Sequence, residues 1–198
     1  MKCIISFFIA VLCIVFLVAP KSALGAKATI KAIDLTVKED FLYVTTLMQE
    51  AFTERIKEAV STGSPTQFLI YLQIRKKLAP LLTMPLISTV ITYNLSYDSL
   101  KKQYQVTQSI KGKSAKSLIT DDWDEIIAWV SELRRVEFPM AVIRERGADY
   151  IRIKAEMKCF RLPFPLNQVF NLVSLWNFET PWEVYWFEDI LGEELMTD

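Results

Sequence analysis

Residues 91–97 read ITYNLSY, and their side chains alternate strictly between apolar and polar. Successive side chains of a β-strand point to opposite faces of the sheet. The apolar face consists of Ile91, Tyr93, Leu95 and Tyr97. A strand with one polar face belongs to a sheet that covers a core on one side and meets water on the other, which is typical of antiparallel sheets. The stretch therefore predicts an antiparallel sheet wetted on one face.

The same period of two recurs on both sides of this stretch, between residues that favour turns. Upstream, Lys38-Glu39-Asp40 joins two alternating segments into a predicted hairpin. A connector from Pro80 to Pro85 is expected before the strand at 91–97, and KGKSAKS at 111–117 is expected to form a basic loop tip. The predicted strands are residues 33–37, 44–48, 68–74, 91–97, 104–110, 151–159 and 182–186.

Helical spacing occurs in a few segments between these strands. Residues 53–63 have Thr53 as a candidate N-cap and Gly63 just past the end, which predicts a short amphipathic helix. Residues 120–136 predict a longer helix, with acidic residues near its positive N-terminus and arginines near its negative C-terminus, as the helix macrodipole favours. A further short helix is predicted over 166–176. The charged residues of the longer helix are Asp121, Asp122, Asp124, Glu125, Arg134 and Arg135.

These elements predict an α+β fold in a single domain, residues 26–198. We expect a mainly antiparallel β-sheet of about six to eight strands, with a sandwich-like arrangement as one option. About two or three short helices accompany it. A chain of this length can bury a core of its own.

The first 25 residues have the layout of a Sec-type signal peptide. Lys2 forms a short basic region, residues 3–19 are uninterruptedly apolar, and small residues end the segment at Ala23-Leu24-Gly25. Cleavage after Gly25 would deliver the domain to the periplasm. The apolar run is only slightly shorter than the span of about 20 residues that a membrane helix needs. An inner-membrane anchor formed by residues 3–19 is therefore the alternative.

Acidic and basic residues balance, with 23 of each. Removal of Lys2 and Lys21 with the signal peptide leaves a slight excess of negative charge. Proteins that bind nucleic acids concentrate positive charge to neutralise phosphates. The balance therefore argues against a nucleic acid as partner.

Histidine is absent from the sequence, which also contains only 3 cysteines. Cys3 and Cys13 lie in the predicted signal peptide, so Cys159 has no partner for an intrachain disulfide. Without histidine, no Ser-His or Cys-His nucleophile pair, imidazole base or His-containing zinc site can form. We therefore expect no metal and no cofactor, and an enzyme would have to use carboxylate, lysine or tyrosine chemistry.

Other conspicuous features have plain structural explanations. Cys159 falls on the apolar side of its predicted strand, where a thiol is usually an inert small hydrophobe. The acidic cluster at 121–125 complements the helix macrodipole, although a cation site is the alternative. Gly112-Lys113-Ser114 resembles part of a phosphate-binding loop but lacks the earlier glycine that such a loop requires.

The stretch 176–186, WNFETPWEVYW, contains Trp176, Trp182 and Trp186. Period two places Trp182, Val184 and Trp186 on one side of a final strand, and Glu183 with Tyr185 on the other. Indoles aligned with a valine predict core residues of a closing strand, each burying a large area. The alternative is an exposed platform for a ligand or a membrane. Its candidate binding residues are Trp176, Trp182, Tyr185 and Trp186.

Several sequence segments, in their order along the chain, resemble those of a bacterial family, domain of unknown function 4390. The segments are IKAIDLTVKEDFLYV (30–44), STGSPTQFLIYLQIRKK (61–77), YNLSYDSLKKQYQVT (93–107), LPFPL (162–166) and WNFETPWEVYW (176–186). The resemblance covers nearly all of the chain after the signal peptide. It implies an exported envelope protein of Gram-negative bacteria, and it brings no catalytic residues with it. It also implies a membrane sensor kinase as one partner.

The leading functional hypothesis is a non-catalytic envelope protein, a binding or assembly module at the outer side of the inner membrane. Its partner would be another envelope protein, and it would touch the membrane only through an uncleaved N-terminal segment. A second hypothesis is a hydrolase of envelope glycans that uses two carboxylates. Its candidate carboxylates are Asp121, Asp122, Asp124, Glu125, Glu179 and Glu183. A third is an apolar-ligand or lipid carrier, which would need a pocket above roughly 300 Å³.

Overall fold

The computed structural model describes residues 28–159 and 178–191. The predicted signal peptide, the predicted helix over 166–176 and Trp176 lie outside these residues. The strands are β1 (Thr29–Lys38), β2 (Phe41–Gln49), β3 (Thr66–Ala79), β4 (Leu82–Asp98), β5 (Gln103–Ile110), β6 (Lys113–Thr120), β7 (Glu132–Pro139), β8 (Tyr150–Cys159), β9 (Phe178–Glu179) and β10 (Glu183–Trp186). The helices are α2 (Glu54–Ser61), α3 (Trp123–Ser131), α4 (Met140–Arg146) and α5 (Phe187–Leu191).

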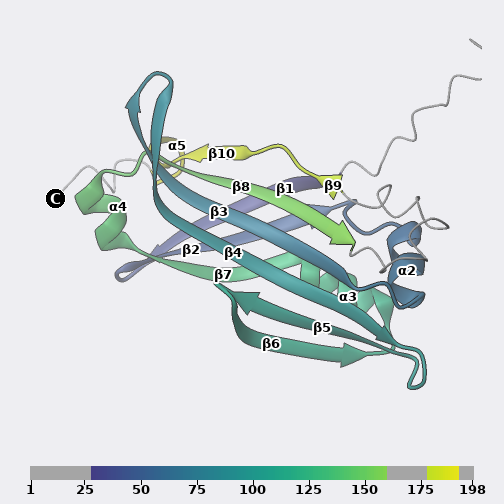
Figure 1. Ribbon diagram of the computed structural model, residues 1–198. Coiled ribbons are helices and arrows are strands. Elements are labelled where there is room, and N and C mark those ends of the chain that lie inside the picture. The colour runs from purple at the N-terminus through teal and green to yellow at the C-terminus, as the bar shows by residue number, and fades with distance from the viewer. Residues whose placement is uncertain (1–27, 160–177, 192–198) are drawn as a thin grey trace, which may run out of the picture.

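The described strands form two antiparallel sheets that cross in Figure 1. The small sheet has 3 strands in the order β1-β2-β7. The large sheet has 7 strands in the order β10-β8-β3-β4-β5-β6, with β9 also paired to β8. Every strand pair is antiparallel. The predicted class, a mainly antiparallel fold with short helices, is confirmed.

The core lies between the two sheets and forms one continuous cluster. The alternation read in residues 91–97 is confirmed, because Ile91, Tyr93 and Leu95 of β4 are buried and the residues between them are half-buried or exposed. The apolar faces of β3 and β8 are buried beside them, as their alternation predicts. The large sheet therefore has one dry face and one wet face.

The predicted helix at residues 53–63 is confirmed as α2. Thr53 is its N-cap, and Gly63 follows its end with a φ of 83°. A positive φ is easily adopted by glycine, which has no Cβ, and ends the helix cleanly. Ile56 and Val60 of this helix are buried in the core.

The predicted helix over residues 120–136 is wrong in its second half. Helix α3 ends at Ser131, and the chain continues directly as β7, which pairs with β2. Val136 and Phe138 alternate there with exposed residues and enter the core. Pairing and burial of β7 outweigh the helical propensity of its sequence. The arginines at 134 and 135 therefore lie in a strand and do not complement a helix dipole.

Two predicted loops are strands instead. The expected connector from Pro80 to Pro85 is part of a hairpin, because β3 runs to Ala79 and β4 starts at Leu82. Pro85 is accommodated where the register shifts at Arg75, a position where a strand tolerates the missing N–H. This hairpin projects from the body of the molecule in Figure 1.

The expected basic loop at 111–117 is a tight turn followed by β6. Gly112 occupies the turn with a φ of 79°, and Lys113 already pairs with Ile110. The resemblance of Gly112-Lys113-Ser114 to a phosphate-binding loop is therefore explained by a hairpin turn. Helix α4 was not predicted from the sequence. None of the helices in the described ranges has the length and apolarity needed to cross a bilayer.

Candidate functional site

The large sheet extends past the small one, and the overhang forms one wall of a groove. Strands β5 and β6 continue the large sheet beyond β4, while the small sheet ends at β7. Helix α3 closes one end. The resulting groove, which we call the inter-sheet groove, has a volume of about 730 Å³. Its lining includes Tyr93, Ile110, Lys116, Trp129, Leu133, Val136 and Glu137.

Aromatic side chains form the floor of the inter-sheet groove. Tyr93 of β4 and Trp129 of α3 meet edge to face, with ring centroids 5.5 Å apart and planes at 81°. Gln108 of β5 donates a hydrogen bond from Nε2 to the Tyr93 hydroxyl at 2.9 Å. Burial raises the pKa of Tyr93 to about 12, although Gln108 acts in the opposite direction. The phenol therefore stays neutral and offers a polar group within an apolar floor.

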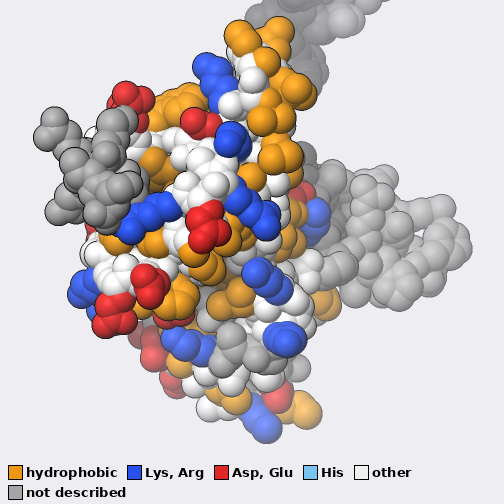
Figure 2. Space-filling model, turned by 90° about the vertical axis from the view of Figure 1, so that its left-hand side faces the viewer, with side chains coloured by type: hydrophobic (Ala, Val, Ile, Leu, Met, Phe, Trp, Pro, Cys, Tyr) orange, Lys and Arg blue, Asp and Glu red, His pale blue; other side chains and the backbone are white. Residues whose placement is uncertain are grey.

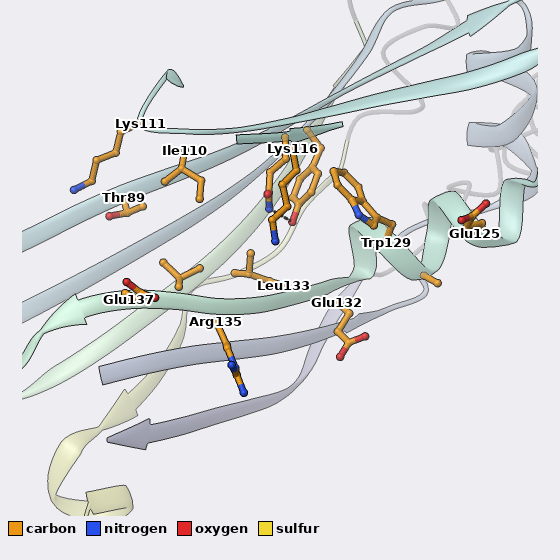
Figure 3. Close-up of a pocket in the computed structure, with 14 residues that line it drawn as sticks. Thr89, Ile110, Lys111, Lys116, Glu125, Trp129, Glu132, Leu133, Arg135 and Glu137 are labelled. Carbon is orange, nitrogen blue, oxygen red and sulfur yellow. Dashed lines mark hydrogen bonds between the residues drawn. The ribbon is translucent and has the colours of Figure 1, made fainter. Parts of the chain in front are cut away.

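The strand register places a lysine beside this tyrosine. Tyr93 pairs with Gln108, and Gln108 pairs with Lys116 of β6, so the three side chains lie in a row on one face. Figure 3 shows Lys116 pointing into the groove from the large sheet and Leu133 pointing into it from β7. The two walls thus present both an ammonium group and an apolar surface.

The opposite wall is strand β7, which is irregular at its centre. Arg135 has a φ of 52°, and the register with β2 shifts between Thr46 and Val44. Such a bulge leaves an extra residue unpaired and bends the strand. In Figure 3 the side chains of Glu132 and Arg135 point away from the large sheet, whereas Leu133 points toward it. Among the described strands, β7 pairs only with β2, so its other edge borders the groove.

The candidate carboxylates are not arranged as a catalytic pair. Asp122 is the N-cap of α3 and accepts a hydrogen bond from the amide of Asp124 at 2.9 Å. The acidic cluster at 121–125 is exposed, and no group of three or more metal-binding side chains forms among the residues that the structure describes. Helix capping therefore explains the cluster.

Glu179 and Glu183 lie on opposite faces of the large sheet. Glu179 pairs with Glu156, which is on the outer face, whereas Glu183 pairs with Ile153, which faces the core. Residues that pair directly across two strands point to the same side. Glu179 instead forms an ion pair with Lys154. The two carboxylates cannot flank one substrate bond.

The outer face of β3 and β8 carries a cluster of aromatic and cationic side chains, which we call the outer-face cluster. It consists of Tyr71, Arg152, Lys154 and Trp182. The guanidinium of Arg152 lies 4.1 Å from the centroid of the Trp182 ring, and Tyr71 meets the same indole at 6.4 Å between centroids. Cations stacked on indoles stabilise both groups. Burial lowers the pKa of Arg152 below its usual value, and the positive charge of the nearby Arg75 lowers it further.

A hydrogen-bonded carboxylate adjoins this cluster. Glu156 accepts hydrogen bonds from the Tyr71 hydroxyl at 2.9 Å and from Lys158 at 3.0 Å. Burial alone would raise the pKa of Glu156, but the hydrogen bonds from Lys158 and Tyr71 outweigh it and lower the pKa. The same bond to Glu156 raises the pKa of Lys158. Burial, followed by the bond to Glu156, raises the pKa of Tyr71.

The predicted core position of Trp182 and Trp186 is wrong. Strand β10 pairs Tyr185 with Ile151 and Val184 with Arg152, so Tyr185 faces the core and Val184 faces outward. Val184 is 44% exposed and Trp186 39% exposed, while Tyr185 packs against the core. The alternation was read correctly, but the faces are reversed. Trp186 packs on Tyr150, and Trp182 packs on Arg152. Each indole therefore contacts a residue on the outer face of β8 and not the core between the sheets.

The candidate binding residues are therefore divided between two faces. Trp182 and Trp186 lie on the outer face, Tyr185 lies on the core side, and Trp176 lies outside the described residues. Cys159 ends β8 opposite Thr66, and the prediction about its side chain also lies outside what the structure describes.

The family model described as domain of unknown function 4390 matches residues 25–185. The chain belongs to this family. The resemblance seen in the order of the sequence segments is confirmed. Comparison with curated proteins and with solved structures found no match. The match spans both sheets and ends within β10, so the inter-sheet groove and the outer-face cluster are features of the matched part of a family 4390 chain.

Reading the sequence of this family 4390 chain did not identify the inter-sheet groove. Trp129 is the one residue whose pattern could have pointed to it. Trp129 lies on the apolar stripe of the predicted helix with Ile126, Val130 and Leu133, where an indole can be either buried in the core or partly exposed at a groove. Nothing in the pattern indicated that the large sheet would overhang the small one. The groove depends on the relative position of the two sheets, which only the structure gives.

Proposed function

We propose that this family 4390 protein is a non-catalytic binding module of the cell envelope, exported by its N-terminal signal peptide. Its ligand is an extended segment of a partner envelope protein that lies along β7 in the inter-sheet groove. The observation that carries the proposal is a groove of about 730 Å³ bordered by a strand edge with no strand partner among the described residues. A membrane sensor kinase, which the sequence resemblance implies, is one partner of this class.

An extended peptide fits this site by strand addition. A peptide paired to a free strand edge gains main-chain hydrogen bonds, and alternate side chains enter pockets on one side. Val136 and Leu133 provide an apolar wall on β7, and Tyr93 with Trp129 provides the floor. The bulge at Arg135 limits the regular pairing edge to a few residues. Affinity would therefore depend on side chains that enter the groove as well as on main-chain pairing.

The groove fits a lipid carrier less well, although its volume exceeds the roughly 300 Å³ that such a site needs. Its lining carries both Lys116 and Glu137, together with polar groups from Thr89 and Gln108. A cavity for an acyl chain would be lined mainly by apolar side chains. A polypeptide presents charges of both signs along its length, so a mixed lining favours it.

A hydrolase is also less well supported. Glu179 and Glu183 lie on opposite faces of the sheet, and Asp122 is engaged as a helix cap. The paired carboxylates of glycoside hydrolases flank one bond and lie about 5 to 10 Å from each other. Release of reducing sugars from envelope glycans by the purified protein, abolished by Glu179→Gln, would contradict the non-catalytic proposal.

Site-specific photo-crosslinking in cells tests the proposed ligand. A benzophenone amino acid replaces Lys116 on one wall of the groove and, in a second variant, Glu137 on the other. Both side chains are exposed, so the replacements preserve the core. We expect the same protein adduct from both positions. A synthetic peptide copied from the crosslinked segment should then slow hydrogen exchange of the β7 amides.

Gln105 is the matched control, because it is exposed on β5 and pairs with Ser96 on the wet face of the same sheet. A crosslinker at Gln105 should give no such adduct. Equal adducts from all three positions, or no protein adduct from the groove, would refute the proposed site. An adduct with the mass of a lipid would favour the carrier instead.

Export is tested separately by mass spectrometry of the native protein from envelope fractions. We expect an N-terminus at Ala26. Recovery of intact Met1 in the membrane fraction would replace the periplasmic assignment by an inner-membrane anchor formed by residues 3–19.

A further inference from the structure

The projecting hairpin formed by the ends of β3 and β4 has an unusually apolar tip. Its strands continue past the last residues paired with β8, since β8 starts opposite Arg75. Figure 1 shows the hairpin extending beyond α4 and α5, and Figure 2 shows hydrophobic side chains gathered at its end. The exposed apolar residues are Leu78 (52% exposed), Leu81 (100%), Leu82 (58%) and Met84 (43%).

Single exposed leucines are normal on soluble proteins, but several adjacent ones mark an interaction site. The whole segment 75–87, RKKLAPLLTMPLI, contains three cations and no acidic residue. The cations Arg75, Lys76 and Lys77 all precede the apolar tip. The hairpin therefore has an apolar end and a basic base.

The hairpin is held in its projecting position by polar contacts at this base. The Arg75 guanidinium crosses to the other arm and donates from Nη2 to the Thr83 hydroxyl at 2.8 Å and to the Thr83 carbonyl at 3.1 Å. Lys76 Nζ donates to the carbonyl of Arg146 at the end of α4, at 2.8 Å. These bonds order the hairpin before it binds a partner. Binding through the leucines at its tip therefore costs little further conformational entropy.

Charged and aromatic groups surround the base of the hairpin. Trp186 lies beside it, with Lys77 Nζ 5.9 Å from the indole centroid. Among the neighbouring elements, α4 carries Arg144, Glu145 and Arg146, and α5 carries Glu188 and Asp189; Asp149, just before β8, accepts a hydrogen bond from the Lys77 amide. The hairpin projects past α4 and α5, which carry acidic side chains. These carboxylates would be repelled by an anionic surface if the whole side of the molecule approached it. Contact through the projecting tip avoids this repulsion.

We propose that the β3–β4 hairpin docks tip first on an anionic phospholipid surface. Leu78, Leu81 and Leu82 enter the boundary between headgroups and acyl chains, while Lys76 and Lys77 remain at the level of the phosphates. The proposal rests on charge complementarity, since basic residues next to an apolar wedge are attracted to anionic leaflets. Tryptophan favours the same interfacial depth, which suits the position of Trp186.

The dimensions of the tip agree with shallow insertion. Each arm contributes about three residues beyond the cations, and a strand rises about 3.3 Å per residue, so the tip reaches about 10 Å. Interfacial segments bury their apolar side to about 5 to 10 Å, whereas a bilayer core is about 30 Å thick. The hairpin can therefore dock but cannot span. A second copy is a poorer occupant, because pairing two such tips would bring Lys76 and Lys77 of both chains together.

Vesicle flotation of the protein purified from envelope fractions tests the proposal. We expect binding to vesicles that contain phosphatidylglycerol, and little binding to vesicles of phosphatidylcholine alone. The double variant Leu81→Ser/Leu82→Ser should bind at least about tenfold more weakly, because it removes two apolar anchors. Lys77→Gln should weaken binding about fivefold at low salt, and added salt should diminish that difference.

Leu100→Ser is the matched control. Leu100 is 94% exposed in the β4–β5 turn and is followed by Lys101 and Lys102, but it has no exposed apolar neighbours of its own in that turn. Its replacement should leave vesicle binding unchanged. All variants should keep the wild-type thermal midpoint, because the replaced side chains are exposed.

Three outcomes would overturn the proposal. The wild type could fail to bind anionic vesicles, or it could bind them equally well after the hairpin replacements, as an N-terminal anchor would cause. It could also be a dimer in sedimentation experiments that becomes monomeric with Leu81→Ser/Leu82→Ser and never binds vesicles. The last result would assign the tip to a second copy of the chain. None of these results bears on crosslinking in the inter-sheet groove.

Discussion

Thr46 is a polar residue in the inward row of β2, between Val44 and Met48. It is 1% exposed, and its Oγ1 has no hydrogen-bond partner among the described residues. A buried hydroxyl without a partner loses its hydrogen bonds to water on folding and gains nothing in return, which costs about 1 to 3 kcal/mol. Thr46→Val replaces the hydroxyl by a methyl group of similar size and should recover this cost.

We expect Thr46→Val to raise the free energy of unfolding by about 1 to 3 kcal/mol. For a domain of this size each kcal/mol corresponds to about 2 to 4 °C, so the thermal midpoint should rise by several degrees. Urea denaturation followed by circular dichroism measures the free energy. Its slope with urea concentration should stay the same, because the surface exposed on unfolding is unchanged.

Thr66 provides a matched control at the start of β3. It is 2% exposed, but its hydroxyl donates to the Ser64 carbonyl at 3.2 Å. Thr66→Val removes that bond and should lower the free energy of unfolding by about 0.5 to 1.5 kcal/mol. The two substitutions should therefore have opposite signs. If Thr46→Val destabilises the protein as Thr66→Val does, the Thr46 hydroxyl is hydrogen-bonded in the folded protein and carries no such cost.

Other predictions concern strand β10, the outer face of the large sheet and the end of helix α4. In urea denaturation, Tyr185→Ala should lower the free energy of unfolding by about 1 to 3 kcal/mol, and Val184→Ala should lower it by less than about 0.5 kcal/mol. If Val184→Ala is the more destabilising, Val184 faces the core, as the sequence predicted. The pKa of Glu156 in the folded protein lies below its ordinary value of 4.5, so its stabilising contribution is present above pH 4.5 and is lost as the pH falls further. Glu156→Gln should therefore reduce the fall of the thermal midpoint with decreasing pH below 4.5. An equally steep fall in the variant would contradict this. Gly147→Ala should lower the thermal midpoint, at a cost of about 1 kcal/mol, because Gly147 has a φ of 62° at the end of α4, and an unaltered midpoint would count against the strain.

Side-chain alternation predicted the central strands of the large sheet and failed at its borders. Strands β3, β4 and β8 are paired on both sides, so their buried faces are determined by the row of apolar residues itself. Strand β10 is short and lies at an edge, and both of its faces offer large apolar side chains. Its orientation is fixed by the register with β8, which a single sequence does not contain.

Local signals also misled where pairing was long-range. The prolines at 80 and 85 indicate a loop, yet cross-strand pairing and the Arg75 bonds to Thr83 hold them within a hairpin. Residues 132–136 continue a helical pattern, yet they lie against β2, which is far away in the sequence. In both cases partners distant in the chain decided the conformation, as is usual for β-structure.

Strand β4 connects the two surfaces to which we assign binding. It starts at Leu82 in the hairpin tip and passes Thr89 and Tyr93, which line the inter-sheet groove. At about 3.3 Å per residue, Thr89 lies at most roughly 23 Å from Leu82 and Tyr93 at most roughly 36 Å. A protein docked by its hairpin would therefore hold the groove within a few tens of ångströms of the lipid surface. Extended segments that leave a membrane anchor pass through this height, so a segment of this kind would fit the ligand that we propose for the groove.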